Sequence, residues 1–405
     1  MNILIVTQYF WPESFRINDL AVSLKKLGHT VTVLTSCPNY PEGRIYEGYG
    51  WFKKTTEIYE GITIKRVPVI PRGKNNPIKL CLNYLSYVIS ASLLGLFYCR
   101  EKIDVIFVYE PSPITVGLPA IFLKKWKKAK LFFWVQDLWP ETLEAVGMVR
   151  SPSLLKCLDK LSAFIYRHCD KILIQCEGFK ESVEKKGVNA EKIYYFPNWA
   201  EEVYRPLTRS ESKVDQSLFS QGFNIVFAGN LGVAQSLETI VSAAEKLQAY
   251  QDIHWFILGD GRQADWLAEQ VKEKKLTQHV HLLGRHPMEH MPEYFAMADI
   301  LLVTLKYDPV FSITIPAKIQ SYLACGKPIV GALSGFGADL IKNSGAGFAG
   351  EAEDAEQLAK NILLCYNMNK TQLNTMGENG LQYCREHFDR NKLIVSLVNW
   401  MQDDI

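Results

Sequence analysis

The sequence lacks the residue patterns that mark several large classes of protein. Its nine cysteines are scattered and form no C-x-x-C pair, which favours free buried thiols in a reducing compartment over disulfides. The eight histidines are dispersed, no Asp-x-Asp pair follows a predicted strand, and no Ser-His-Asp or Cys-His order stands out. We therefore expect neither a bound metal nor a catalytic triad.

An excess of charge of one sign is also missing. The chain carries 45 Lys and Arg against 43 Asp and Glu, a net charge of +2. It has no basic stripe, so nucleic acid is disfavoured as a partner, and attraction to a membrane would need a local patch. Met1 leads directly into an apolar segment without a basic region or a cleavage site. We therefore expect a cytoplasmic protein without a signal peptide.

What is present is the composition of a soluble protein and an alternation of strands and helices. Apolar residues make up 48% and charged residues 22% of the 405 residues, enough for two or three domains. Residues 2–7 read as a buried strand, 14–27 as a helix and 29–34 as a second strand. This order predicts a parallel sheet with ligands at the carboxyl ends of its strands. The usual glycine-rich first loop is replaced by Glu13 to Arg16.

The alternation continues through two halves of the chain. Further strands are predicted in the first half at 60–70, 104–110, 131–136, 170–176 and 193–198. Strands are predicted in the second half at 223–230, 254–261, 279–285, 299–305 and 329–333. The polar segment 201–221 predicts a linker. We expect an α/β protein with two doubly wound parallel-sheet domains, 1–200 and 206–385, facing a central cleft, and a final helix within 386–405 that packs on the first domain.

Two segments of the first half are candidates for a membrane surface. Residues 80–99 carry no formal charge and reach the length of a membrane span. A span would separate neighbouring strands of one sheet by a bilayer, so a buried helix and a membrane-surface helix are the main alternatives. The lysine-rich run 124–130 is either a solvated helix end or a patch for anionic lipid.

Short glycine turns follow three predicted strands of the second half. They contain Gly229, Asn230 and Gly232, then Gly259 and Asp260, and finally Arg285. Backbone N–H groups at such turns can approach a phosphate closely, which predicts a nucleotide at this edge of the sheet. The alternative is that the glycines serve only the backbone conformation.

The stretch 308–337 joins a proline-containing segment, a helix, a strand and a glycine-rich loop. Pro316 is expected in the first helical turn. Thr314, Ile315 and the free amides beside them would receive an anion. Lys318 lies where the helix dipole disfavours a cation unless an anion is bound. We predict a diphosphate at this helix start, with a solvent-facing lysine as the alternative.

Two carboxylates follow a buried strand of the first half. Asp137 and Glu141 come directly after residues 131–136. A carboxylate at this edge of the sheet is placed to bind a sugar hydroxyl or to act as a base. The alternative is that one of them caps the following helix.

An acceptor is expected at the neighbouring strand ends. Glu110 closes another strand on the same rim, and Glu13, Arg16 and Tyr40 lie in the adjacent loops. Glu13 and Arg16 are expected to pair and to orient the acceptor.

Several segments are similar to glycosyltransferase family 4. They are MNILIVTQYF, GHTVTVLT, FPN, FAGNLG, FILGDG, HLLGR, ADILLVTL and ACGKPIV, and they cover almost the whole chain. The resemblance implies the GT-B fold and retaining, metal-independent transfer from a nucleotide sugar. QYFWPESFRIND, PNYPEGRIYEGYGW, VQDLWPE and TIPAKIQSYLACGKPI further resemble the WbuB-like L-fucosamine transferases of bacterial surface polysaccharide synthesis.

The sequence departs from the family at charged positions. The two family glutamates fall on Ile313 and Ser321, and the diphosphate-binding Arg and Lys fall near Asn230 and Gln235. The common family His falls at Gln136. Donor recognition must therefore be rebuilt from other residues.

The candidates for that role are Thr314, Lys318 and Arg285 for phosphate and nucleotide. Asp137 or Glu141 would serve the sugar or the acceptor, and Lys318 would assist the departing diphosphate. The co-substrate would be a UDP-sugar, with no further cofactor.

The resemblance implies transfer of a sugar, such as the N-acetylated deoxyhexosamine L-FucNAc, to a polyprenyl-diphosphate-linked saccharide. The product would belong to O-antigen, lipopolysaccharide or capsule synthesis, and the enzyme would lie on the inner face of the plasma membrane through 80–99 and 124–130. Two alternatives stay open. One is a UDP-sugar 2-epimerase, which shares the GT-B architecture and needs no membrane features. The other is a non-catalytic nucleotide-sugar-binding homologue.

Overall fold

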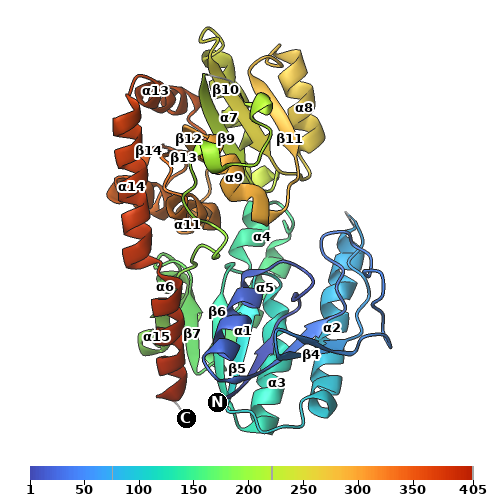
Figure 1. Ribbon diagram of the computed structural model, residues 1–405. Helices are drawn as coiled ribbons and strands as arrows, with labels where there is room; N and C mark the ends of the chain where they lie inside the picture. Colours follow the sequence, from blue (N-terminus) through green and yellow to red (C-terminus); the bar gives the residue numbers. More distant parts are fainter. Residues whose placement is uncertain (75, 220–221, 404–405) are drawn as a thin grey trace. The chain divides into compact units, whose positions relative to one another are not determined.

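The computed structural model describes residues 1–74, 76–219 and 222–403 (Figure 1). The chain divides into two compact units. Unit 1 comprises residues 1–144, 149–197 and 391–405, and unit 2 comprises 145–148 and 198–390. Residues 220–221 of the predicted linker and 404–405 of the predicted final helix lie outside the described residues.

Unit 1 is built on an eight-stranded sheet with the order β3-β4-β2-β1-β5-β6-β7-β8. Its strands are β1 (Asn2–Val6), β2 (Thr30–Ser36), β3 (Thr56–Tyr59), β4 (Ile62–Val67), β5 (Val105–Glu110), β6 (Lys130–Val135), β7 (Lys171–Ile174) and β8 (Ile193–Tyr195). β3 pairs antiparallel with β4, and the other neighbours pair parallel. The strands β5 and β6 are near-continuous runs of buried apolar residues, as expected of strands covered on both faces.

The helices of unit 1 connect these strands. They are α1 (Arg16–Lys26), α2 (Pro77–Tyr98), α3 (Gly117–Lys127), α4 (Glu141–Ala145), α5 (Pro152–Arg167) and α6 (Phe179–Lys185). The final helix, α15 (Arg390–Gln402), returns to the edge of this sheet. There the Trp400 ring lies 5.0 Å from the Tyr194 ring, and Lys171 donates to the Trp400 carbonyl at 3.0 Å.

Unit 2 is built on a six-stranded parallel sheet with the order β11-β10-β9-β12-β13-β14. The strands are β9 (Phe223–Ala228), β10 (Ile253–Leu258), β11 (Val280–Gly284), β12 (Ile300–Thr304), β13 (Ile329–Ala332) and β14 (Gly347–Gly350). Its helices are α7 (Leu237–Lys246), α8 (Ala264–Glu273), α9 (Met291–Met297), α10 (Pro309–Ser312), α11 (Ala317–Ala324), α12 (Phe336–Asn343), α13 (Ala355–Tyr366) and α14 (Lys370–His387). One apolar core joins β9, β10, α7, α8 and α13.

The structure corrects three predictions about the second half. Residues 347–350, where the sequence predicted no strand, form β14, because Gly347 allows close parallel pairing with Ile329 of β13. The segment 308–315 contains the short helix α10, and α11 begins after Pro316, which caps it rather than standing in its first turn.

The predicted linker is also more ordered than its composition suggested. Arg209 donates to the Met297 carbonyl at 2.9 Å, and Ser212 donates to the Glu293 carbonyl at 3.1 Å. These bonds fix the described part of the segment to unit 2, so its polar residues reflect surface packing rather than freedom from it.

Candidate functional site

The glycine turns of unit 2 lie against one another at the carboxyl edge of its sheet. The Gly229 N–H donates to the Leu258 carbonyl at 2.9 Å, and the Gly259 N–H donates to the Gly284 carbonyl at 2.8 Å. A Cβ at Gly259 would overlap the carbonyl oxygen of Gly229. The φ angle is +147° at Gly229 and +145° at Gly259. Backbone packing therefore requires glycine at position 259, and the positive φ favours glycine at both positions.

This packing narrows the role predicted for the glycines. The N–H groups of Gly229 and Gly259 are already donated within the loops, and the Gly261 N–H donates to Asp260 Oδ1 at 2.7 Å. They are not available for a phosphate in this structure. The turns bring three loop backbones close together. Because their N–H groups are already used, an anion at this edge would have to be bound by other groups.

Lys318 of α11 supplies such a group at the same edge. α11 begins after Pro316, so the backbone N–H groups of Ala317 and Lys318 lie in its first turn. One turn later, Tyr322 receives a hydrogen bond from the Ala228 N–H at 3.0 Å. Residues 318 and 322 share one face of the helix. The contact of Tyr322 with the end of β9 thus directs Lys318 toward the first glycine turn.

The ammonium of Lys318 lies in a site made by β9 and the loop after it. Its Nζ donates to Gln235 Oε1 at 2.6 Å and stands 3.9 Å from the centre of the Phe227 ring. A Cβ added to Gly229 would lie 3.1 Å from this Nζ. Burial lowers the pKa of Lys318 from 10.5 to about 7. A bound anion would favour the charged ammonium and raise this pKa.

The other residues predicted to bind the donor differ in which of their groups a ligand could contact. The Thr314 hydroxyl donates to the Val310 carbonyl at 2.7 Å, so its proton closes α10 instead of facing an anion. The Ile315 side chain is buried in the core and can offer only its backbone. Asn230, Asp260 and Arg285 are exposed at the ends of β9, β10 and β11.

In unit 1, Glu110 and Asp137 end two neighbouring strands, β5 and β6. Glu110 pairs in register with Val135, two residues before Asp137. Glu110 is fully buried. Burial, and then the charge of Asp137, raises the pKa of Glu110 well above its usual range. Burial raises the pKa of Asp137 to about 7.

This burial corrects the role predicted for Glu110. A carboxyl group with no exposed surface cannot contact an acceptor, and burial, by raising its pKa, favours the protonated form. Asp137 is partly accessible, so it is the member of the pair that a substrate could reach. Tyr166, also buried, lies close enough for its pKa to be raised by burial and by both carboxylates.

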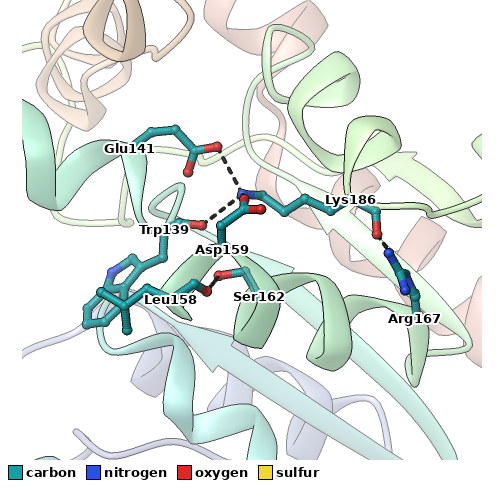
Figure 2. Close-up of polar contacts among 7 residues, drawn as sticks. All are labelled: Trp139, Glu141, Leu158, Asp159, Ser162, Arg167 and Lys186. Carbon is teal, nitrogen blue, oxygen red and sulfur yellow. Dashed lines mark hydrogen bonds and ion pairs between the residues drawn. The ribbon is translucent and has the colours of Figure 1, made fainter. Parts of the chain in front are cut away.

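Lys186 holds the loop that follows β6, as Figure 2 shows. Its side chain is 4% exposed, and its ammonium donates to Trp139 O at 3.0 Å, Glu141 Oε1 at 3.0 Å and Asp159 Oδ1 at 2.8 Å. The Lys186 carbonyl accepts from Arg167 Nε at 2.9 Å. Three elements, α4, α5 and the end of α6, therefore meet at one ammonium.

This arrangement separates the two predicted catalytic carboxylates. Glu141 is the first residue of α4 and is paired with Lys186, so its charge is already compensated. Asp137 remains the better candidate for the chemistry. Sequence reasoning missed Lys186, because it stands in the run Glu184-Lys185-Lys186-Gly187, which reads as an ordinary helix end. Nothing in that run separates the buried lysine from its exposed neighbour.

Glu13 connects two loops at the other side of the unit 1 strand ends. Glu13 Oε1 accepts from the N–H groups of Asn39 at 2.8 Å and Tyr40 at 2.7 Å. The side chain is buried, and burial raises its pKa to about 7 against the opposing effect of those amides. Glu13 therefore positions the 39–40 loop rather than contacting an acceptor. Arg16 is the first residue of α1.

Tyr40 is the accessible member of the same region. Its ring lies 5.4 Å from Phe15 and 5.6 Å from Tyr9, and the Arg72 guanidinium stands 4.9 Å from its centre. Tyr40 is 38% exposed. Aromatic faces of this kind suit the apolar side of a sugar ring or a lipid chain.

Two family profiles match the chain, one on each half. Residues 14–199 match the glycosyl transferase 4-like domain, and residues 208–383 match the glycosyl transferases group 1. Together they include every strand of both sheets except β1, and they include Asp137 and Lys318.

Among curated proteins, the chain is 24% identical over 346 residues to the E. coli K12 protein WcaI, which is named as a colanic acid biosynthesis glycosyl transferase. That match covers 80% of this chain and 82% of WcaI. The chain is also 21% identical to N-acetyl-alpha-D-glucosaminyl L-malate synthase of Bacillus anthracis, over 93% of this chain and 90% of that protein.

Solved structures share the fold of the chain at low sequence identity. HepE of Anabaena in complex with UDP aligns with a TM-score of 0.74 at 15% identity, over 100% of both chains. Sucrose-phosphate synthase of Thermosynechococcus elongatus aligns with a TM-score of 0.76 at 15% identity, over 99% of this chain and 98% of that one. The predicted GT-B fold, an α/β fold with two parallel-sheet domains, is thereby confirmed.

Proposed function

We propose that this glycosyltransferase transfers a sugar from a UDP-sugar with retention of the configuration at the sugar C1. The chain has a glycosyl transferase 4-like domain followed by a group 1 domain. The acceptor is a polyprenyl-diphosphate-linked saccharide, and the donor binds unit 2. UDP and UDP-glucose are the ligands in the solved HepE complexes of Anabaena. These complexes support a nucleotide sugar as the donor.

The contact between Lys318 and Gln235 carries the proposal. The family resemblance places a diphosphate-binding lysine near Gln235, where this chain has an amide. Lys318 approaches that same place from α11, with its ammonium 2.6 Å from the Gln235 side chain. A cation delivered from another element can perform the same electrostatic task as the missing lysine. We assign Lys318 to the diphosphate, with the α11 amides beside it and Arg285 toward the nucleoside.

The chemical step breaks the bond between the sugar C1 and the UDP β-phosphate oxygen and forms a bond from C1 to the acceptor oxygen. The acceptor arrives on the face from which UDP leaves, so configuration is retained. Its proton passes to the departing phosphate oxygen or to Asp137. Lys318 stabilises the charge that develops on the diphosphate, which is the main requirement of the step. We propose that no metal is needed.

The relatives support a product at the cell surface. WcaI is assigned to colanic acid biosynthesis, and TuaH of Bacillus subtilis, 24% identical over half of each chain, to teichuronic acid biosynthesis. With the sequence resemblance, these names favour O-antigen, capsule or lipopolysaccharide synthesis, with an N-acetylated deoxyhexosamine such as L-FucNAc as the sugar. We place the enzyme on the cytoplasmic face of the plasma membrane, where lipid-diphosphate acceptors are accessible.

The test begins with calorimetric titration of UDP, GDP and dTDP into wild type and Lys318→Gln. UDP should bind best, and Lys318→Gln should weaken it by about 10- to 100-fold, the value of a hydrogen bond between charged groups. Lys342→Gln, an exposed change at the far end of α12, should leave the affinity unchanged. Equal UDP affinity in wild type and Lys318→Gln would remove Lys318 from the site.

Turnover is then measured with UDP-sugars and a lipid-diphosphate-linked saccharide, with EDTA present and absent. Transfer that requires the acceptor and resists EDTA supports the proposal. Release of UDP at one rate with and without acceptor argues against a transferase acting on this acceptor. A wild type that binds no nucleotide overturns the donor assignment.

A further inference from the structure

The larger apolar residues of α2 lie on its exposed side, which is unusual for a helix surrounded by water. On its buried side, every fourth residue is polar or small, namely Asn83, Tyr87, Ala91 and Gly95. Its exposed side carries Ile78, Leu82, Leu85, Ile89, Leu93 and Phe97. A surface helix of a soluble domain normally shows the reverse pattern. An exposed apolar stripe of this length indicates a surface that meets an apolar medium or partner.

The buried side of α2 is fixed to the sheet by hydrogen bonds, so the helix cannot rotate to hide the stripe. Gln8 Nε2 donates to Asn83 Oδ1 at 2.6 Å, and Asn83 Nδ2 donates to the Ile70 carbonyl at 2.7 Å. The Tyr87 hydroxyl lies 3.0 Å from the Thr7 carbonyl. Ile89 and Phe97 consequently remain 59% and 62% exposed.

Length and composition alone would also allow α2 to cross a membrane. The sheet argues against a crossing. β4 precedes α2 and β5 follows it, and both belong to the same sheet, with β2 and β1 between them. Both ends of α2 must therefore stay on one side of a bilayer, which leaves a helix lying in the plane of the interface.

The surroundings of the stripe are basic. α3 packs beside α2, where a Cβ at Gly95 would lie 3.3 Å from Leu123. Beyond Leu123, α3 exposes Lys125 and Trp126, which is 68% exposed, and the residues that follow the helix expose Lys128 and Lys130. In the ranges that the structure describes, these three lysines have no ion-pair partner. Residues 71–130 hold ten Lys and Arg against three Asp and Glu, whereas the whole chain holds 45 against 43.

We propose that the outward face of α2 and the basic end of α3 form one docking surface for a bilayer that contains anionic lipid. The apolar stripe enters the acyl boundary, and the lysines meet the lipid phosphates. Exposed Trp and Lys are suited to that boundary. A second copy of this chain would fit the basic end poorly, because the same positive charges would face each other.

The surface is connected to the candidate acceptor region through α2 itself. The Tyr84 ring lies 6.4 Å from Trp139, in the loop that carries Asp137. An acceptor anchored in the bilayer under α2 would thus lie beside that loop. This last step rests on the proposed function, whereas the docking surface does not.

Sedimentation with vesicles tests the surface, using phosphatidylcholine alone or mixed with phosphatidylglycerol. Wild type should bind the mixed vesicles. Leu85→Gln/Ile89→Gln should weaken binding by about tenfold or more. Lys125→Gln/Lys128→Gln/Lys130→Gln should weaken binding by about 100-fold on the mixed vesicles and should reduce its dependence on salt.

The matched control is Leu154→Gln/Leu364→Gln, which changes two leucines of similar exposure, 47% and 50%, away from α2. Three results would overturn the proposal. They are a wild type that does not bind mixed vesicles, equal binding of the α2 variant and the control, and a wild-type dimer in sedimentation velocity that the α2 changes dissociate. UDP affinity, measured on the same samples, should be unchanged in the variants. A wild type that does not bind UDP would contradict the donor proposal, whereas the vesicle result would remain valid.

Discussion

Lys318 and Gln235 are 83 residues apart in the chain, yet their side chains share a hydrogen bond of 2.6 Å at the end of β9. The lysine comes from α11 and the glutamine from the loop after β9. The sequence marked each residue separately, but it gave no sign that the two side chains meet. Together they place a titratable cation where the family resemblance expects one and the local sequence lacks it.

The pKa of Lys318 leads to a prediction about protons. With a pKa of about 7, Lys318 is mostly neutral at pH 8 in the free protein. A bound diphosphate favours the charged form and raises the pKa, so binding at pH 8 should take up about one proton, and affinity should fall as pH rises above 7. Calorimetry in two buffers of different ionisation enthalpy measures the uptake. Lys318→Gln should lose it, and uptake that persists in this variant would assign the proton to another group.

Replacing Asp137 by Asn should separate activity from stability. Turnover should fall while UDP affinity stays unchanged, because Asp137 lies in unit 1 and not among the donor residues. Folding holds the proton of Asp137 up to about pH 7, whereas the unfolded chain releases it near 3.8. Stability of the wild type should therefore decrease as pH rises from 4 to 7. Chemical denaturation across this range should show a smaller decrease for the variant. Wild-type turnover in Asp137→Asn would restrict the residue to a structural role.

Lys186→Met should damage the 137–141 loop, whereas Lys185→Met should not. The first change leaves Glu141 and Asp159 without their shared cation. The cost should be about 1–3 kcal/mol, below that of a fully buried pair because both carboxylates keep some exposure. The pair of Lys185 with Glu181 is solvent-exposed and screened by water, so it should contribute much less. Urea unfolding measures both. If Lys186 positions the loop, kcat should fall more than UDP affinity, and a uniform loss of both would indicate misfolding instead.

Gly259→Ala should destabilise the protein more than Gly28→Ala. Both glycines have positive φ, +145° and +87°, but a Cβ at Gly28 meets no atom within 4 Å, whereas one at Gly259 overlaps Gly229. Strain alone should cost about 1 kcal/mol, and the overlap should add about 1–3 kcal/mol. UDP binding should also weaken in Gly259→Ala. Equal melting temperatures of the two variants would show that the loops can separate at no cost.

Local patterns in the sequence predicted most of the fold. Buried apolar runs such as 104–110 and 131–136 marked the strands, and their spacing marked the helices between them. Residues 347–350 were missed, because a strand with three weakly hydrophobic positions is stable only beside β13. The ordering of the described part of 201–221 likewise depends on partners in unit 2 that composition does not reveal.

For the candidate site, the sequence predicted the positions of the residues better than their accessibility. Strand ends correctly indicated where Asp137, Glu110 and the glycine turns would lie. Side-chain burial then decided their availability, which changed the interpretation of Glu110 and Glu13 from contacts to internal supports. The assignment of Lys318 and Asp137 to a substrate stays a prediction until the titrations are done.

The sequence by itself determined the alternation of strands and helices, the carboxyl edges where chemistry can occur and the uncharged run 80–99 that forms most of α2. These follow from local periodicity and from the chirality of the parallel sheet. Only the tertiary structure decided which side of α2 is exposed, which of Lys185 and Lys186 is buried, and that Lys318 reaches Gln235. Each of these depends on contacts between residues far apart in the chain, and burial and pKa are properties of those contacts and not of the residue type.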